Sequence, residues 1–135
     1  FIGYLTPFLK ITKGSEYIGK YKIFTPKAVG SGDGKSDLIK PIIGEPNAIC
    51  TETYVVAGTY STKKEAENAK TYINTKFFHF LLTLRKNTQD CLGKVFTYIP
   101  MQDFSKPWTD AELYAKYKLT REEIDFIESM IRPME

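Results

Sequence analysis

One amphipathic stretch, residues 62–86, constrains the fold of this chain more than any other part of the sequence. Thr62 is followed three residues later by Glu65, which is the spacing of a capping box at the start of a helix. Apolar side chains then recur every three or four residues on one face: Ala66, Ala69, Ile73, Phe77, Phe80, Leu81 and Leu84. Arg85 and Lys86 follow, and cations are favourable at the C-terminal end of a helix. We therefore expect one helix of about two dozen residues at the centre of the fold.

Three segments have the composition of β-strands. Residues 20–25 alternate Lys or Thr with large apolar residues, which predicts a half-buried strand with its lysines on the open face. Pro26 ends this strand or places it at an edge. Residues 53–60 are rich in β-branched and aromatic residues, and residues 94–99 form a similar run before Pro100. The sequence therefore predicts strands on both sides of the long helix.

Shorter segments complete this picture. The apolar residues 1–5 resemble a strand, residues 38–39 and 42–43 flank Pro41 as a short irregular strand, and residues 45–47 are typical of a turn. Two further capping boxes, Thr109 to Glu112 and Thr120 to Glu123, predict two short helices near the C-terminus. We expect an α+β fold, with a small mixed or antiparallel sheet packed on one long central helix and a helical C-terminal tail.

The length of 135 residues is that of one domain. We expect a single domain over residues 1–135, with the sheet and long helix in 1–100 and the helical tail in 101–135. The chain begins with Phe1 inside an apolar segment, which indicates a fragment of a larger protein. It contains no apolar run of roughly 20 residues and no signal peptide. We therefore expect a cytoplasmic location and no membrane partner.

Charge is unevenly placed, although the net charge is only +3. Residues 1–40 contain seven lysines and three acidic residues, whereas residues 101–135 contain five basic and eight acidic residues. This polarity is typical of a protein with one side facing a polyanion and another facing solvent or a partner.

Metal and nucleotide sites are poorly supported by the sequence. Cys50, Cys91 and the single His79 are too few and too widely spaced for a zinc site, and we expect both cysteines to be reduced thiols and His79 to be a packed or half-exposed ring. The glycine-rich segment 30–36 ends in Gly-Lys-Ser, but residue 29 is not the glycine that a phosphate-binding loop requires. Such a loop can still contact phosphates through its amides and Lys35.

The end of the predicted long helix carries side chains suited to reading DNA. Arg85, Lys86, Asn87, Gln89 and Asp90 follow one another there. Arg, Asn and Gln make paired hydrogen bonds to G and A in the major groove. The alternative is that Arg85 and Lys86 only stabilise the helix end and that Asn87 only terminates the helix.

Eight short segments then point to a family through their order along the chain. They are Cys50–Tyr54, Ala66–Asn68, Thr75–Phe78, Lys86–Asp90, Pro100–Phe104, Trp108–Asp110, Leu113–Tyr114 and Leu119-Thr120-x-x-Glu123-Ile124. Over roughly residues 20–132 this set resembles the C-terminal region of bacterial restriction–modification proteins, of the adenine-specific DNA methyltransferase type and its fused type II enzymes. The catalytic and cofactor-binding motifs of that family are absent, since the chain has no Pro-Pro pair and residues 1–4 lack the second glycine.

The resemblance implies a target recognition domain that binds double-stranded DNA and is not an enzyme by itself. The methyltransferase domain of the same parent chain would handle the flipped adenine with S-adenosylmethionine, and a fused parent would also carry an endonuclease activity. No cofactor is implied for the fragment. The residues expected to contact DNA are Lys20, Lys22, Lys27, Ser31, Lys35, Thr51, Glu52, Lys76, Arg85, Lys86 and Gln89. The lysines would hold phosphates, while Arg85, Gln89 and Ser31 would read bases.

Two other functions remain open at this point. The fragment could be a scaffold module that docks on the methyltransferase core through the acidic tail with Phe126 and Ile127. It could also be a catalytic fragment such as a nuclease, although no Ser/His/Asp or Glu-x-Lys arrangement is present in the sequence.

Overall fold

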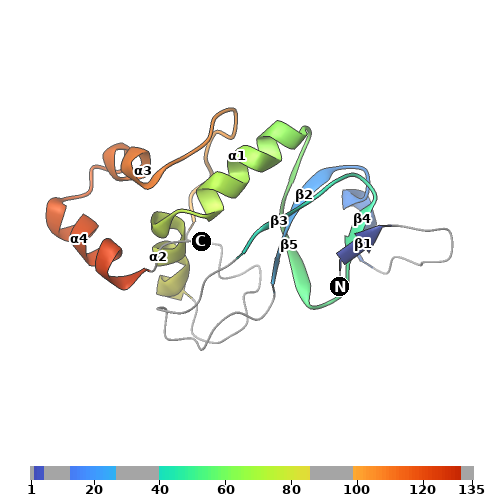
Figure 1. Cartoon of the computed structure of the whole chain (residues 1–135), viewed down its shortest axis with the longest axis horizontal. Coiled ribbons are helices and arrows are strands. Elements are labelled where there is room, and N and C mark those ends of the chain that lie inside the picture. The colour runs from blue at the N-terminus through green and yellow to red at the C-terminus, as the bar shows by residue number, and fades with distance from the viewer. Residues whose placement is uncertain (1, 5–12, 27–39, 86–98, 132–135) are drawn as a thin grey trace.

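The computed structural model describes residues 2–4, 13–26, 40–85 and 99–131. Its elements are two small antiparallel sheets and four α-helices within these ranges (Figure 1). The α+β class predicted from the sequence is therefore confirmed. The predicted strand over residues 94–99 lies almost entirely outside the described residues. Within the described ranges, no helix has both the length and the apolar composition needed to cross a membrane.

The larger sheet has the strand order β3–β2–β5. Strand β2 (Tyr21–Pro26) pairs antiparallel with β3 (Ile42–Gly44) on one side and with β5 (Tyr54–Tyr60) on the other. The register with β5 shifts between Ile23 and Phe24, as at a β-bulge. Residues 22–25 are all buried because β2 is the central strand and both of its faces are covered. The prediction that this strand has an open face was therefore wrong.

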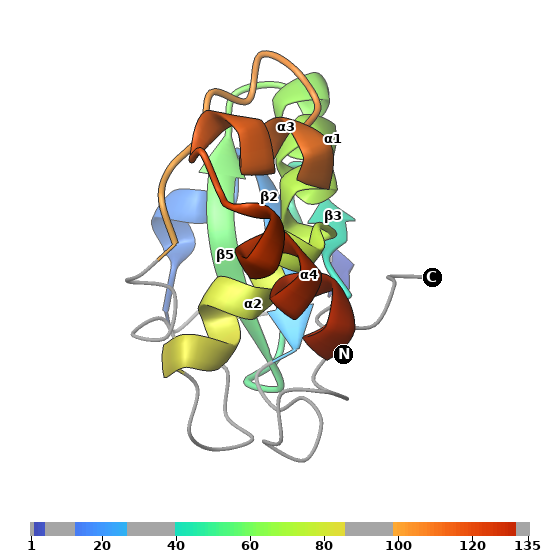
Figure 2. The ribbon, with the colours of Figure 1, turned by 90° about the vertical axis from the view of Figure 1, so that its left-hand side faces the viewer.

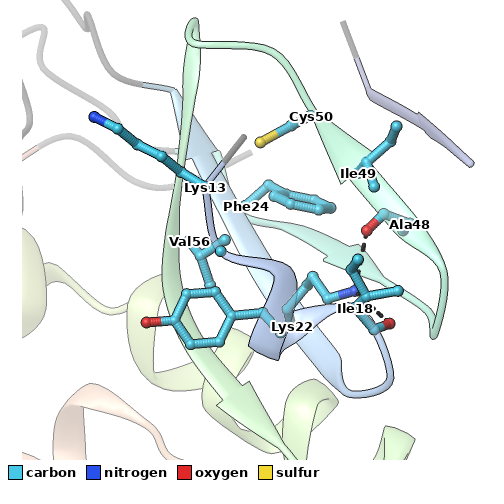
Figure 3. Close-up of a pocket in the computed structure, with 10 residues that line it drawn as sticks. Lys13, Ile18, Lys22, Phe24, Ala48, Ile49, Cys50 and Val56 are labelled. Carbon is cyan, nitrogen blue, oxygen red and sulfur yellow. Dashed lines mark hydrogen bonds between the residues drawn. The ribbon is translucent and has the colours of Figure 1, made fainter. Parts of the chain in front are cut away.

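The smaller sheet pairs β1 (Ile2–Tyr4) with β4 (Ala48–Cys50). A tight turn joins β3 to β4: the N–H of Ala48 donates to the carbonyl of Glu45 at 2.9 Å, and Asn47 has φ of 71°. Pro46 and Asn47 thus occupy the two central positions of a type II turn, where Pro and a residue tolerating positive φ are favoured. The turn predicted at residues 45–47 is confirmed. A short 3-10 helix, η1 (Ser15–Tyr17), lies next to this turn (Figure 3).

Helix α1 (Lys63–Ile73) packs across the larger sheet (Figures 1 and 2). Its buried face includes Ala66, Ala69 and Tyr72. The hydroxyl of Thr62 accepts from the N–H of Glu65 at 3.2 Å, which confirms the predicted helix start. In a complete capping box the Glu65 carboxylate would accept from the N–H of Thr62. Here it accepts from the N–H of Ser61, one residue earlier.

The predicted long helix is two helices. Helix α1 ends at Ile73 and α2 covers Lys76–Arg85. Thr75 begins α2, because its hydroxyl accepts from the N–H of Phe78 at 3.1 Å. The carboxylate of Asp110 accepts from the N–H groups of Lys76 (3.1 Å) and Phe77 (2.9 Å). The first three N–H groups of α2, which have no partner within a helix, are thus satisfied by two side chains.

Helices α3 (Asp110–Lys116) and α4 (Arg121–Met130) begin where the sequence predicts. Both capping boxes are complete, with Thr109 and Glu112 on α3 and Thr120 and Glu123 on α4. Both helices pack on α2 (Figure 2). A single apolar cluster joins the sheet to this helical part, from Ile23 through Tyr72 and Leu82 to Leu113 and Ile131.

Asp110 provides a test of how the helices are held together. We expect Asp110→Ala to lower the free energy of unfolding by about 1–2 kcal/mol, since it removes the cap of α2 and an acidic group from the first turn of α3. Urea unfolding followed by circular dichroism measures this. The control is Asp125→Ala, which removes an exposed carboxylate paired only with Arg121 and should cost about 0.5 kcal/mol or less. Equal effects of the two substitutions would contradict the capping role.

Candidate nucleic-acid interface

One end of the molecule gathers several of the residues expected to contact DNA. The C-terminal end of β2 at Pro26, the start of β5 at Tyr54 and the C-terminal end of α2 at Arg85 all lie toward the bottom of both views (Figures 1 and 2). The strand register agrees, since Pro26 pairs with Tyr54. Lys40 lies at this end as well, because it precedes Ile42, which pairs with Phe24. We call this region the β2–α2 end.

The chain leaves the described core for two further segments at the β2–α2 end. Residues 27–39 connect Pro26 to Lys40, and residues 86–98 begin directly after Arg85. These two segments contain five of the predicted DNA contacts, which lie outside the described residues: Lys27, Ser31, Lys35, Lys86 and Gln89. Pro26 and Arg85, after which the two segments begin, thus lie at the same end of the molecule. Residues 40–85 separate the two segments in the sequence.

Thr51 and Glu52 also belong to the β2–α2 end. Both are exposed, and the hydroxyl of Thr51 lies 3.0 Å from that of Thr53. Arg85 is the last residue of α2, so its backbone lies at this end. Lys40 is exposed at this end, although it was not among the residues predicted to contact DNA. The signal that could have found it is its place directly before Pro41 and β3, at the far boundary of the glycine-rich segment.

Lys20 lies at the opposite end of the sheet. It precedes Tyr21, which pairs with Tyr60 at the end of β5. Lys20 is exposed, but the sheet separates it along the strand direction from Pro26 and Tyr54. The structure therefore does not bring Lys20 together with the other predicted contacts.

Lys22 is not on the surface, which corrects the prediction that it contacts phosphate. Only 2% of this residue is exposed, and its ammonium donates to the carbonyls of Ile18 (3.3 Å), Glu45 (3.4 Å) and Ala48 (3.0 Å) (Figure 3). Burial lowers the pKa of this lysine from its ordinary value, and the nearby Cys50 acts in the opposite direction. Lys22 thus joins η1 to the β3–β4 turn and cannot reach a ligand outside.

Lys76 has a partner within the protein. It lies at the N-terminal end of α2, away from Arg85, and its ammonium forms an ion pair with Glu128 of α4. The same carboxylate accepts from the hydroxyl of Tyr114 on α3 at 2.9 Å. The Lys76 ammonium holds the pKa of Glu128 below its ordinary value, with a smaller contribution from the Tyr114 hydroxyl. Lys76 therefore joins α2 to α4 instead of extending the β2–α2 end.

Among the described residues, the side chains with potential for catalysis are buried or half-buried. His79 is buried in α2, which is the first of the two environments, packed or half-exposed, that the sequence left open. Cys50 has a free thiol beside a cavity of about 80 Å³, and burial raises its pKa, which disfavours the reactive thiolate (Figure 3). Among the described residues, no three His, Cys, Asp or Glu side chains are grouped so that they could hold a metal ion.

Lys22 should matter for stability. We expect Lys22→Met to lower the free energy of unfolding by about 2 kcal/mol, because it removes the donor shared by three buried carbonyls. Lys20→Met, on the exposed residue two positions earlier, should change it by about 0.5 kcal/mol or less. Urea unfolding of both variants checks this. If Lys22→Met proved as stable as Lys20→Met, the three hydrogen bonds would be of no net value.

Glu128 should give stability that depends on pH. Its pKa is lower in the folded state than in the unfolded chain, so its contribution is present above the unfolded pKa and is lost as pH falls through the folded pKa. We expect Glu128→Gln to cost about 1 kcal/mol at neutral pH, since solvent screens this partly exposed carboxylate, and clearly less near pH 3. Unfolding at both pH values measures the difference. Glu67→Gln, on the exposed side of α1, is the control and should cost about 0.5 kcal/mol or less at neutral pH.

Comparisons with known proteins give no match. No protein-family model, no curated protein and no solved structure is similar to this chain. The family suggested by the eight ordered segments therefore stays a proposal.

Proposed function

We propose that this chain is a target recognition domain that binds double-stranded DNA, from a bacterial adenine-specific DNA methyltransferase of a restriction–modification system. The observation that carries the proposal is that residues 27–39 and residues 86–98 both begin at the β2–α2 end (Figure 1). Segments far apart in the sequence, both rich in residues suited to DNA contact, start from one end of a folded core. DNA-binding side chains on connecting segments held by a rigid scaffold are a common arrangement.

The charges at this end favour a polyanion, though only modestly. Residues 26–40, 51–53 and 85–98 contain six basic and four acidic side chains. The helical tail, residues 101–135, has the opposite balance. A basic end and an acidic helical tail would orient the domain as it approaches DNA.

Individual roles follow from side-chain chemistry. Lys27, Lys35 and Lys40 would contact phosphates and set the position of the domain on the duplex. Arg85, Gln89 and Ser31 have the donors and acceptors that distinguish base edges. Thr51 and Glu52, at the same end of the described core, would complete the surface. Lys22 and Lys76 have no part in this proposal, because their ammonium groups are used within the protein.

Chemistry would belong to the rest of the parent enzyme. The methyltransferase domain of the same chain would bind S-adenosylmethionine and receive the flipped adenine, while this domain holds the recognised site. The domain by itself is proposed to be non-catalytic, and the parent could also be an endonuclease. Incubation with supercoiled plasmid and magnesium tests the nuclease alternative, for which nicking is required.

A docking module is the second candidate. It is favoured by Phe126, which is 55% exposed on the acidic helix α4. In this role the domain would pack on the methyltransferase core, and other parts of the parent would contact DNA. Lack of DNA binding by the purified domain, together with binding to the core, would favour this function over the first.

DNA binding is tested with the purified chain and a labelled duplex across a salt series. We expect affinity to fall steeply with salt, and a random-sequence pool to yield a short enriched motif. Lys40→Glu should weaken binding by about tenfold at low salt and flatten the salt slope by about 1. Lys64→Glu makes the same charge change on the exposed start of α1 and should alter affinity by about twofold or less.

Two results would overturn the proposal. One is the absence of DNA binding even at about 50 mM salt, where phosphate contacts are strong. The other is an equal loss of affinity in Lys40→Glu and Lys64→Glu, which would place the DNA elsewhere or reveal only general charge attraction.

A further inference from the structure

Helices α2 and α4 lie in front of the sheet in the view of Figure 2. Residues of α2, of α4 and of the segment before α4 line an apolar groove. Its walls include Phe77, Phe80 and Leu81 of α2 and Phe126 and Ile127 of α4, and its volume is about 390 Å³. The rings of Phe80 and Phe126 meet edge to face, with centroids 5.8 Å apart and an interplanar angle of 88°. This ring contact joins α2 to α4 where both helices line the groove.

Large apolar side chains around this groove remain in contact with solvent. Phe126 is 55% exposed, and Leu84, one turn beyond Phe80 and Leu81 on α2, is 59% exposed. A single exposed apolar residue is ordinary in a soluble protein. Here the exposed side chains belong to the same helix faces as a continuous groove, and such a surface is typical of an interaction site.

The rim of the groove on α4 is acidic. Glu122 and Glu123 line it, and neither forms an ion pair within the described part of the chain. The carboxylate of Glu123 only accepts from the N–H of Thr120 at the start of α4. The other two acids of the helix are paired, Asp125 with Arg121 and Glu128 with Lys76. The groove thus presents apolar surface beside two carboxylates that have no basic side-chain partner among the described residues.

We propose that this groove binds a basic amphipathic helix of a partner protein. Its apolar side chains would lie on Phe80, Leu81 and Phe126, and its lysines or arginines would face Glu122 and Glu123. A helix suits the space between two helices better than an extended strand, because α2 and α4 offer no open row of backbone groups for a strand to pair with. The ten residues of α4 extend about 15 Å, which matches anchors at positions i, i+3 or i+4, and i+7.

The first experiment measures binding of three labelled helical peptides of about 18 residues to the 135-residue chain by fluorescence anisotropy. The basic peptide has leucines at the anchor spacing and lysines on both flanks. The second peptide replaces the lysines with glutamates, and the third has the basic peptide's composition in scrambled order. We expect the basic peptide to bind at least about tenfold more tightly than the other two. Equal binding of all three peptides, or no binding, would overturn the proposal.

Variants then locate the peptide. Phe126→Glu should weaken binding of the basic peptide by about tenfold or more. Met101→Glu, which places the same charge at another highly exposed apolar residue, should change it by about twofold or less. Glu122→Lys should weaken the basic peptide and strengthen the acidic one, a reversal that general loss of structure would not produce. Loss of affinity in Met101→Glu equal to that in Phe126→Glu would overturn the assignment to the groove.

Two further measurements distinguish a partner helix in the groove from a second copy of the chain and from DNA. Sedimentation should show a monomer at the concentrations used, and concentration-dependent dimers abolished by Phe126→Glu would make a second copy the occupant and overturn the proposal. The groove contains none of the residues proposed to contact DNA. Phe126→Glu should therefore leave DNA affinity unchanged, so that peptide binding and DNA binding can fail independently.

Discussion

The carboxylate of Asp110 holds the helical part of this protein together. It accepts two main-chain N–H groups at the start of α2, although Asp110 is itself the first residue of α3. One side chain therefore fixes where α2 begins and how α3 lies against it. Glu128 adds a second connection by joining Lys76 of α2 and Tyr114 of α3 to α4. The groove between α2 and α4 exists in its present form because these two carboxylates set the positions of its walls.

The break between α1 and α2 also explains the direction of the chain at the β2–α2 end. A continuous helix would have kept residues 76–85 in line with the part of α1 that covers the sheet. With a new start at Thr75, α2 changes direction and carries Arg85 to the same end as Pro26 and Tyr54 (Figure 1). The side-chain caps of one helix thus determine which distant segments of the chain emerge together.

Much of the fold was predictable because its signals are local. The capping boxes at Thr109 and Thr120 each depend on residues within one turn, and both helices begin as expected. The prediction of a single long helix was wrong. The apolar residues keep the same helical spacing before and after Asn74 and Thr75, so the pattern does not reveal the break between the helices. The residue that separates the two helices, Asp110, lies 34 positions further along the chain. The spacing of apolar residues shows which face of a helix is buried, but it does not show a capping side chain that comes from another element.

The candidate site was harder to predict, for the same reason. Lys20 and Lys22 have similar sequence surroundings, yet one is exposed and the other is enclosed by main-chain carbonyls of η1, the β3–β4 turn and β4. Alternation along β2 placed Lys22 on an open face, because nothing in residues 20–25 shows that a second layer covers it. Lys76 was misread in the same way, since its partner Glu128 comes from α4. Lys40 escaped notice because its exposure depends on the register of β3.

The enclosure of Lys22 has a consequence for chemical modification of the protein. Acylating reagents attack the neutral amine from solution, and the amine of Lys22 donates to the carbonyls of Ile18, Glu45 and Ala48. Figure 3 shows the bonds to Ile18 and Ala48. The reagent can reach it only in molecules whose β3–β4 turn has separated from η1. The acylation rate of Lys22 therefore reports how often this turn opens. The acylation rates of the surface lysines in the same molecule serve as the internal reference.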